Sequence, residues 1–151
     1  ATLFEAGGRL GGIISDASEA EEQALADYGL HLGMAFQMID DALDYGSSSE
    51  DIGKNIGDDL AEGKPTLPLI RAMEVSDEAT TRMLRDVIEQ GGADRVDEVR
   101  KAIESTDAIA YTARLAKQEA ALAKQSLEIL PASAYRTALA AVADFSVDRS
   151  F

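Results

Sequence analysis

Acidic residues crowd into one short stretch of the chain. Residues 36–68 read FQMIDDALDYGSSSEDIGKNIGDDLAEGKPTLP, and the part from Asp40 to Lys64 holds eight carboxylates and two lysines. Carboxylates this close together repel one another, and the repulsion costs free energy unless an opposite charge neutralises it. Water with dissolved salt could do this, and so could a bound metal ion.

The first three of these carboxylates form the pattern D-D-x-x-D. At about 100° per residue in a helix, Asp40 and Asp44 lie on one face, with Gln37 beside them and Asp41 farther round. Two carboxylates one turn apart can hold one Mg²⁺, which prefers oxygen ligands and is commonly bound by one or two carboxylates together with substrate phosphates. A solvated acidic face at a helix end is the alternative, and the pattern alone leaves both interpretations open.

Two lysines follow in the same stretch, each directly after a glycine: Lys54 and Lys64. Glycine lets a ligand come close to the backbone, and the lysine ammonium is a compact charge suited to phosphate. A P-loop needs G-x-x-x-x-G-K-[ST] after a strand, but here five residues separate Gly57 from Gly63, and Pro65 replaces the Ser or Thr. We therefore exclude a P-loop and expect a Mg²⁺–diphosphate site. The alternative is that the lysines are surface counter-ions to the nearby acids.

One long amphipathic helix must present the aspartates. Ser18 and Glu21 form a capping box that predicts its start, and Gly46 with the serines after it predicts an end near Tyr45. The apolar residues of this segment form a narrow stripe at helical spacing, and the aspartates lie on its flank. The stripe consists of Leu25, Tyr28, Leu32, Phe36, Ile39 and Leu43.

The remainder of the chain also has a helical pattern. Residues 1–14 carry apolar side chains at helical spacing, interrupted by four glycines, which suggests that another helix or a ligand approaches closely. We expect a loop over about 46–64, then a helix with Pro65 in its first turn. Residues 107–130 form a long alanine-rich helix that Pro131 ends.

Capping residues and apolar faces predict the later helices. The expected N-caps are Ser76, Asp94, Thr106 and Ser133, and the expected stop is Gly91-Gly92. The expected apolar faces are Leu84, Val87 and Ile88; Val96, Val99 and Ile103; Leu115, Leu122, Ala123, Leu127 and Leu130; and Leu139, Val142 and Phe145. The chain shows no alternating strand pattern, so the sequence predicts an all-α helical bundle.

Composition excludes several other classes. The chain has 151 residues, 46% of them hydrophobic, a net charge of −14 and no cysteine. Such a chain can form one domain with one core and is too apolar to be disordered. No apolar run approaches the ~20 residues of a membrane span. The charge argues against a nucleic-acid partner, and the lack of cysteine suits the cytoplasm.

The stretch FQMIDDALD resembles the second aspartate-rich motif of the trans-isoprenyl diphosphate synthases, F-Q-x-x-D-D-x-x-D. The following GKNIGDDLAEGKPTLP is similar to that region of the octaprenyl-type members, and ATLFEAGG resembles the segment after that family's Lys-Thr motif. The resemblance implies part of an isoprenoid-synthase fold. It also implies a cytoplasmic, homodimeric, Mg²⁺-dependent prenyltransferase that condenses an allylic diphosphate with isopentenyl diphosphate.

The resemblance assigns roles to the aspartates. It implies that Asp40, together with Asp44, holds one Mg²⁺, and that Asp41 contacts the metal through water. It implies that Gln37 hydrogen-bonds near the diphosphate or braces Asp40.

It also assigns roles to the residues on either side. Lys54 and Lys64 are expected to grip the allylic diphosphate. Phe36 lies either close to the carbocation or in the core. Asp58 and Asp59 are expected to shape the loop.

The sequence departs from the family in what it lacks. The first aspartate-rich motif, the arginines after it, the basic residues that bind isopentenyl diphosphate and the Lys-Thr pair are all absent from residues 1–151. We therefore expect 1–151 to be the C-terminal half of a prenyltransferase catalytic domain, which folds as a bundle but catalyses nothing by itself.

Other readings fit less well. A class I terpene cyclase normally carries an N-S-E type second metal site, which this sequence lacks. A di-iron bundle needs paired E-x-x-H, but the chain has one histidine, His31, and Tyr28 stands where the glutamate is needed. The non-enzymatic alternative is a helical dimerisation or regulatory module.

Overall fold

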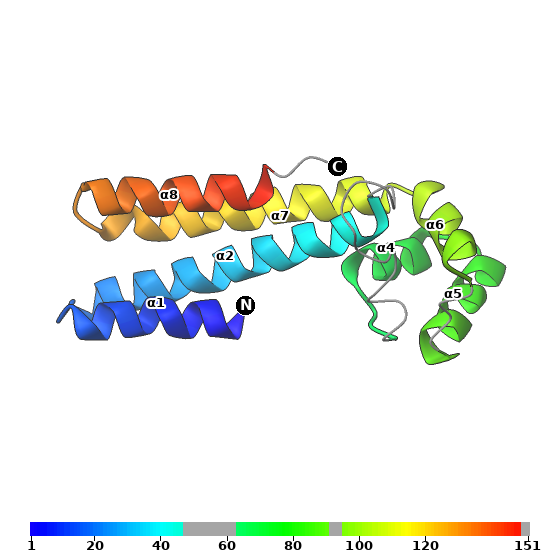
Figure 1. Cartoon of the computed structure of the whole chain (residues 1–151), viewed down its shortest axis with the longest axis horizontal. Helices are drawn as coiled ribbons and strands as arrows, with labels where there is room; N and C mark the ends of the chain where they lie inside the picture. The colour runs from blue at the N-terminus through cyan, green and yellow to red at the C-terminus, as the bar shows by residue number, and fades with distance from the viewer. Residues whose placement is uncertain (47–62, 91–94, 149–151) are drawn as a thin grey trace. The chain divides into compact units, whose positions relative to one another are not determined.

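The computed structural model describes residues 1–46, 63–90 and 95–148, and all regular structure in those ranges is helical. The predicted all-α class is confirmed. None of the helices in this described part is long and apolar enough to cross a membrane. The helices are α1 (Thr2–Ile14), α2 (Glu19–Gly46), α4 (Leu67–Val75), α5 (Glu78–Gln90), α6 (Val96–Glu104), α7 (Ala108–Ser126) and α8 (Ala134–Val147), with a 3₁₀ turn, η2 (Leu127–Ile129), after α7 (Figure 1).

The chain divides into two compact units, and each is described by itself. Unit 1 consists of Ala1–Ile39 and Arg114–Ser150, and unit 2 contains Asp40–Ala113. The helices α2 and α7 each contribute residues to both units. Asp40, Asp41, Asp44 and Lys64 of the predicted site belong to unit 2.

Within unit 1, α1 packs against α2 through glycines. A Cβ atom added at Gly8 would overlap the carbonyl oxygen of Leu25, and one added at Gly12 would lie 2.9 Å from the Cα of Glu22. A Cβ added at Gly7 or Gly11 would meet nothing within 4 Å. The predicted close approach is confirmed at Gly8 and Gly12 but not at Gly7 and Gly11. Of the two expected neighbours, another helix or a ligand, the structure shows a helix.

Capping hydrogen bonds confirm two of the predicted helix starts. At the head of α2, the backbone N–H of Ser18 donates to a carboxylate oxygen of Glu21 (3.0 Å), and the Ser18 hydroxyl donates to the same oxygen (2.7 Å). These bonds lower the pKa of Glu21. At the head of α8, Ser133 accepts from the backbone N–H of Arg136 (3.1 Å).

Two predicted N-caps are one residue too early. The cap of α5 is Asp77, which accepts from the N–H of Thr80 (2.8 Å), while Ser76 ends α4. The helix α7 begins after Asp107, whose carbonyl accepts from Tyr111 (2.7 Å). In both places two polar residues stand side by side, and the pattern cannot tell which of them starts the helix. The hydroxyl of Thr106 instead donates to the carbonyl of Ile103 (2.8 Å). The predicted N-cap Asp94 and the predicted stop Gly91-Gly92 lie outside the described ranges.

The expected position of Pro65 is also wrong. The helix α4 begins at Leu67 after the N-cap Thr66, and Pro68 is the proline in its first turn. The first turn of a helix tolerates proline, because a backbone N–H there has no partner within the helix. Pro65 and Pro68 therefore both fitted the pattern of a helix start.

The core of unit 1 confirms part of the predicted faces: Ala123 and Leu127 are buried, and Leu130 and Leu139 pack against them. Its buried cluster consists of Tyr28, Leu32, Ala123, Leu127 and Ala143. In contrast, Leu122 is 40% exposed, Val142 48% and Phe145 75%, so these three are not the core residues we predicted. The helix α7 buries an alanine face, formed by Ala116, Ala120 and Ala123, because helices with small side chains can approach one another closely. The helix α8 buries Ala143, Ser146 and Val147.

One polar contact ties α2 to α7 inside unit 1. The Nδ1 atom of His31 lies 2.7 Å from a carboxylate oxygen of Glu119, and both side chains are mostly covered. On the preceding turn of the same helix, the hydroxyl of Tyr28 donates to the carbonyl of Leu139 on α8 (2.9 Å).

Unit 2 has its own core, and most of the predicted faces are confirmed there. Leu84, Val87, Val99 and Ile103 are buried, and Ile88 and Val96 pack against them. The other buried members are Tyr45, Leu69, Ala72, Ala102 and Ala108. The end of α2, through Tyr45, and the helix α4, through Leu69 and Ala72, are thus anchored in one cluster. This is the scaffold of the candidate site.

Candidate functional site

The last turns of α2 carry the three aspartates. The helix is continuous to Gly46, so Asp40 and Asp44 lie one turn apart on one face, as predicted. All three aspartates are half-buried, and the Oδ2 atom of Asp44 is inaccessible to solvent. Between them Ala42 is fully buried. The packing of this helix end therefore fixes the two carboxylates as a pair.

Phe36 and Gln37 precede the aspartates on the same helix, and both are exposed. The ring of Phe36 is tilted against that of Phe4, with centroids 5.9 Å apart. It lines an apolar hollow of about 220 Å³ in unit 1, together with side chains of α1, α2 and α8. Within the residues that the structure describes, Phe36 is not part of the buried core, since 38% of the residue is accessible.

Lys64 follows a glycine that the backbone requires. Gly63 has φ +68°, in the left-handed region, and a Cβ added there would lie 2.9 Å from the carbonyl oxygen of Ile88. Lys64 itself is exposed, and its carbonyl accepts from the N–H of Thr66 (3.0 Å). The turn therefore places an exposed ammonium directly before α4. Lys54, Asp58 and Asp59 lie outside the described residues.

The helix α4 is fixed within unit 2 by a side chain that the sequence pattern did not predict. Arg71 donates to Glu74 (2.9 Å) and to Asp107 (3.2 Å), and its guanidinium lies 4.6 Å from the ring centroid of Tyr111. The hydrogen bond to Glu74, and after it the interactions with Asp107, raise the pKa of Arg71. These contacts hold α4, and with it the turn at Lys64, against the start of α7.

The donor set fits a divalent cation bound together with a substrate. In the described ranges no group of three or more His, Cys, Asp or Glu side chains could by itself hold a metal. Asp40 and Asp44 offer two hard oxygen donors, and Mg²⁺ usually completes such a set with waters and substrate phosphates. Each described residue of the predicted site already takes part in at least one polar, ionic or ring contact; these residues are Phe36, Gln37, Asp40, Asp41, Asp44 and Lys64.

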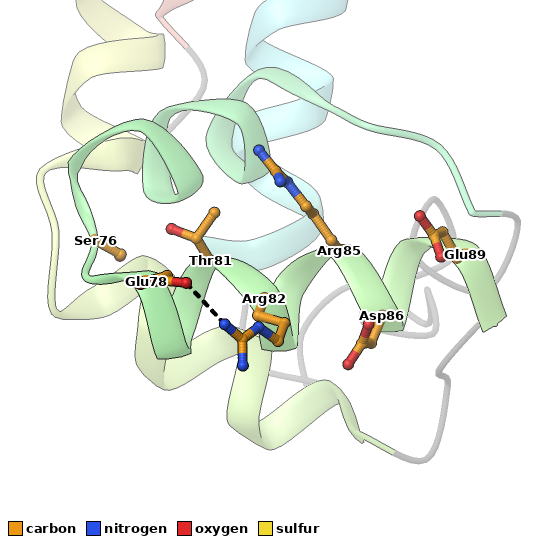
Figure 2. A pocket seen from close by; sticks show the side chains of 7 residues that line it. All are labelled: Ser76, Glu78, Thr81, Arg82, Arg85, Asp86 and Glu89. Atoms are coloured by element: carbon orange, nitrogen blue, oxygen red, sulfur yellow. Dashed lines mark hydrogen bonds and ion pairs between the residues drawn. The ribbon is translucent and has the colours of Figure 1, made fainter.

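A second hollow lies on α5 in unit 2, and it was not predicted. It has a volume of about 360 Å³ and both signs of charge. Figure 2 shows Arg82 turned toward Glu78, with which it forms an ion pair (2.8 Å), while Asp86 lies farther along the helix. Arginines and acids alternate along this exposed face, so it favours no single class of ligand.

Comparison with known proteins finds a family model and relatives that match this chain. A family model described as polyprenyl synthetase matches residues 1–106. The octaprenyl diphosphate synthase of Haemophilus influenzae is 46% identical over all of this chain and 46% of its own length. That of Escherichia coli is 43% identical over 99% of this chain and 46% of its own length.

Solved structures agree in fold. The polyprenyl synthase from Caulobacter crescentus, complexed with calcium and isoprenyl diphosphate, superposes with a TM-score of 0.86 and 40% identity, over 97% of this chain and 45% of that one. A decaprenyl diphosphate synthase from Rhodobacter capsulatus gives a TM-score of 0.85 at 40% identity. The chain spans about half the length of the relatives it matches.

Proposed function

This chain belongs to the polyprenyl synthetase family, and on that premise we propose that it supplies one metal- and diphosphate-binding half of a Mg²⁺-dependent trans-polyprenyl diphosphate synthase of the octaprenyl type. The observation that carries the proposal is the carboxylate pair Asp40 and Asp44 on the last turns of α2, in the same unit as the exposed Lys64. The calcium and isoprenyl diphosphate bound to the Caulobacter crescentus protein support a divalent cation next to a diphosphate.

The reaction is a 1'-4 condensation. The bond from the allylic carbon to the diphosphate oxygen breaks, and its electron pair leaves with the diphosphate. The allylic cation then forms a bond to isopentenyl diphosphate, and a proton is lost from the product. The demand on the protein is greatest at the leaving group, because negative charge grows there in the transition state.

The residues of this chain would meet that demand. Asp40 and Asp44 would hold one Mg²⁺, which when bound neutralises charge on the leaving diphosphate. Asp41 would reach the metal through water, and Gln37 would hydrogen-bond near the diphosphate or brace Asp40. The ammonium groups of Lys54 and Lys64 would bind the diphosphate as point charges.

We also propose that the protein forms a homodimer. The outer face of α1 is uncharged and exposed, and apolar faces of this kind favour association. Its members are Leu3, Leu10, Ile13 and Ile14. The apolar stripe predicted on α2 does not provide such a face, because Leu32 and Ile39 are buried.

The first experiment uses the chain as it is. Within residues 1–151 the pattern D-D-x-x-D occurs once, whereas ionising the substrate needs further metal ligands and a site for isopentenyl diphosphate. We expect the purified chain to bind inorganic diphosphate in a Mg²⁺-dependent manner but to show no elongation with an allylic diphosphate and isopentenyl diphosphate. Elongation should appear when the other half of the E. coli octaprenyl diphosphate synthase is added as a separate polypeptide.

Two results would contradict the proposed function. Chain elongation by a homogeneous monomer of 1–151 alone would show that the chain is not half of a site. Diphosphate binding that is the same with Mg²⁺ and with a chelator would favour a non-catalytic helical module instead. Size-exclusion chromatography with light scattering on the same sample tests the homodimer.

Replacing Lys64 with alanine should damage both substrate binding and turnover. In the reconstituted protein we expect a higher KM for the allylic diphosphate and a lower kcat, because the interaction strengthens as the leaving group gains charge. Steady-state kinetics measure both values. The control is Lys101→Ala, which removes an exposed lysine from α6. Equal damage from the two changes would exclude a phosphate-binding role for Lys64.

A further inference from the structure

The head of α4 carries a polar group that its own fold does not satisfy. Thr66 is 7% exposed, its hydroxyl oxygen is buried, and that oxygen has no hydrogen-bond partner in the part of the chain described. A buried hydroxyl without a partner is costly to keep. We infer that Thr66 is a further diphosphate-binding residue, whose hydroxyl donates to a phosphate oxygen next to Lys64. This inference rests on the proposed function and adds a residue to the same site.

The usual role of such a threonine is to cap the helix, and Thr66 does not do so. Its backbone has the extended geometry of an N-cap (φ −72°, ψ 163°), yet its side chain accepts no capping hydrogen bond. Ser133, the N-cap of α8, accepts from the N–H three residues later. At α4 the second helical residue is Pro68, which has no N–H, and Leu69, the third, does not donate to the Thr66 hydroxyl. The hydroxyl is thus buried at the head of the helix without a capping partner.

The same helix end presents further donors. Ile70 is the first residue of α4 whose N–H bonds back to Thr66 (3.0 Å). The N–H groups of Leu67 and Leu69 lie ahead of that bond, and no backbone carbonyl in the described ranges accepts from them. These orphan N–H groups and the helix dipole together favour an anion at a helix N-terminus. The first turn of α4 carries no acidic side chain that could serve instead.

Position in the chain links this helix end to the exposed ammonium. Lys64 stands two residues before Thr66, and the hydrogen bond from the Thr66 N–H to the Lys64 carbonyl (3.0 Å) closes the turn between them. The ion pairs of Arg71 hold the helix behind it. In the structure the hydroxyl is covered, so binding requires the side chain to turn about χ1 to another staggered position. Hydroxyl, backbone amides and ammonium then present one donor set to one phosphate group.

The variant Thr66→Val removes the hydroxyl while keeping the shape of a β-branched side chain. The probes are inorganic diphosphate and an allylic diphosphate, each with Mg²⁺, titrated calorimetrically into the chain; inorganic phosphate is a third arm that distinguishes a general anion site from one for diphosphates. We expect Thr66→Val to weaken diphosphate binding by about ten- to a hundredfold, since hydrogen bonds to charged groups are the strong ones. Thr66→Ser, which keeps the hydroxyl, should bind within about threefold of the parent chain.

A second measurement separates ligand binding from a structural role. Without ligand, Thr66→Val should unfold at the same temperature as the parent chain or higher, because it removes an unsatisfied buried group. The matched control is Thr106→Val, which removes a hydroxyl that donates to the carbonyl of Ile103. This change should leave diphosphate binding unaltered.

The outcomes distinguish this inference from the proposed function. If the parent chain binds diphosphate and Lys64→Ala weakens binding while Thr66→Val does not, the role of Thr66 is refuted and the proposed function stands. If Thr66→Val lowers the unfolding temperature and leaves affinity unchanged, the hydroxyl is structural and the inference is wrong. If the parent chain binds no diphosphate with Mg²⁺ present, the inference and the proposed function fail together.

Discussion

Replacing Asp40 with alanine should reduce turnover of the reconstituted synthase by a factor of about 10² to 10³. The change removes one of the two carboxylates proposed to hold Mg²⁺, and with it an interaction that is strongest in the transition state. A loss of ~3–4 kcal/mol of transition-state stabilisation corresponds to that factor. The measurement is kcat at saturating substrate and Mg²⁺, together with calorimetric Mg²⁺-dependent diphosphate binding by the chain alone.

Two further variants make this result specific. Asp86→Ala removes an exposed carboxylate from α5 in the same unit and should leave turnover unchanged. Asp44→Ala should resemble Asp40→Ala, since the two are proposed to share one cation. If Asp40→Ala kept most of the activity while Asp44→Ala abolished it, the assignment of Asp40 as the principal metal ligand would be wrong.

Replacing Gly8 with alanine should be the most destabilising single change in α1. The added methyl group would overlap the carbonyl oxygen of Leu25, and a backbone atom cannot move aside without shifting α2. Overpacking of this kind typically costs about 1–3 kcal/mol and occasionally more. Chemical denaturation followed by circular dichroism measures the free energy of unfolding.

The neighbouring glycine provides the control. Gly7 is on the open side of the same helix, where an added Cβ meets nothing. At a protein concentration at which the chain is monomeric, Gly7→Ala should therefore raise the free energy of unfolding by roughly 0.5–1 kcal/mol, the ordinary advantage of alanine over glycine in a helix. If the two substitutions had the same effect, the contact between α1 and α2 would not be the close one described.

Local patterns were enough to predict much of this fold. The capping box of Ser18 and Glu21, the N-cap Ser133 and the long segment ending at Gly46 all match the helices found. These signals depend on atoms within one turn, so a single sequence contains them. The failures at Ser76 and Thr106 arose where two polar residues compete for one helix start.

Tertiary packing was harder to foresee. The exposure of Val142 and Phe145 could not be predicted, because the pattern of α8 admits either these residues or Ala143, Ser146 and Val147 toward the core. Which face is buried depends on how closely α2 and α7 approach it within unit 1. Apolar periodicity gives the size of a face but not its distance from the next helix.

In the candidate site, too, local spacing predicted some residues, and others depend on tertiary packing. Asp40 and Asp44 could be placed on one helix face from spacing alone, and the helix confirms that placement. Thr66 could not be recognised, because an unsatisfied hydroxyl is defined by what surrounds it. Arg71 was missed for a related reason: its partner Asp107 is 36 residues away, beyond any local pattern.

The contact between His31 and Glu119 has a practical consequence. The chain contains one histidine, so its imidazole C–H protons give a single pair of signals in a proton magnetic resonance spectrum, without isotope labelling of selected sites. Those signals arise where α2 meets α7 in unit 1. They therefore provide a built-in spectroscopic probe of that interface. Changes confined to unit 2, such as the binding of a diphosphate at α4, can be compared with a signal that reports on the other unit alone.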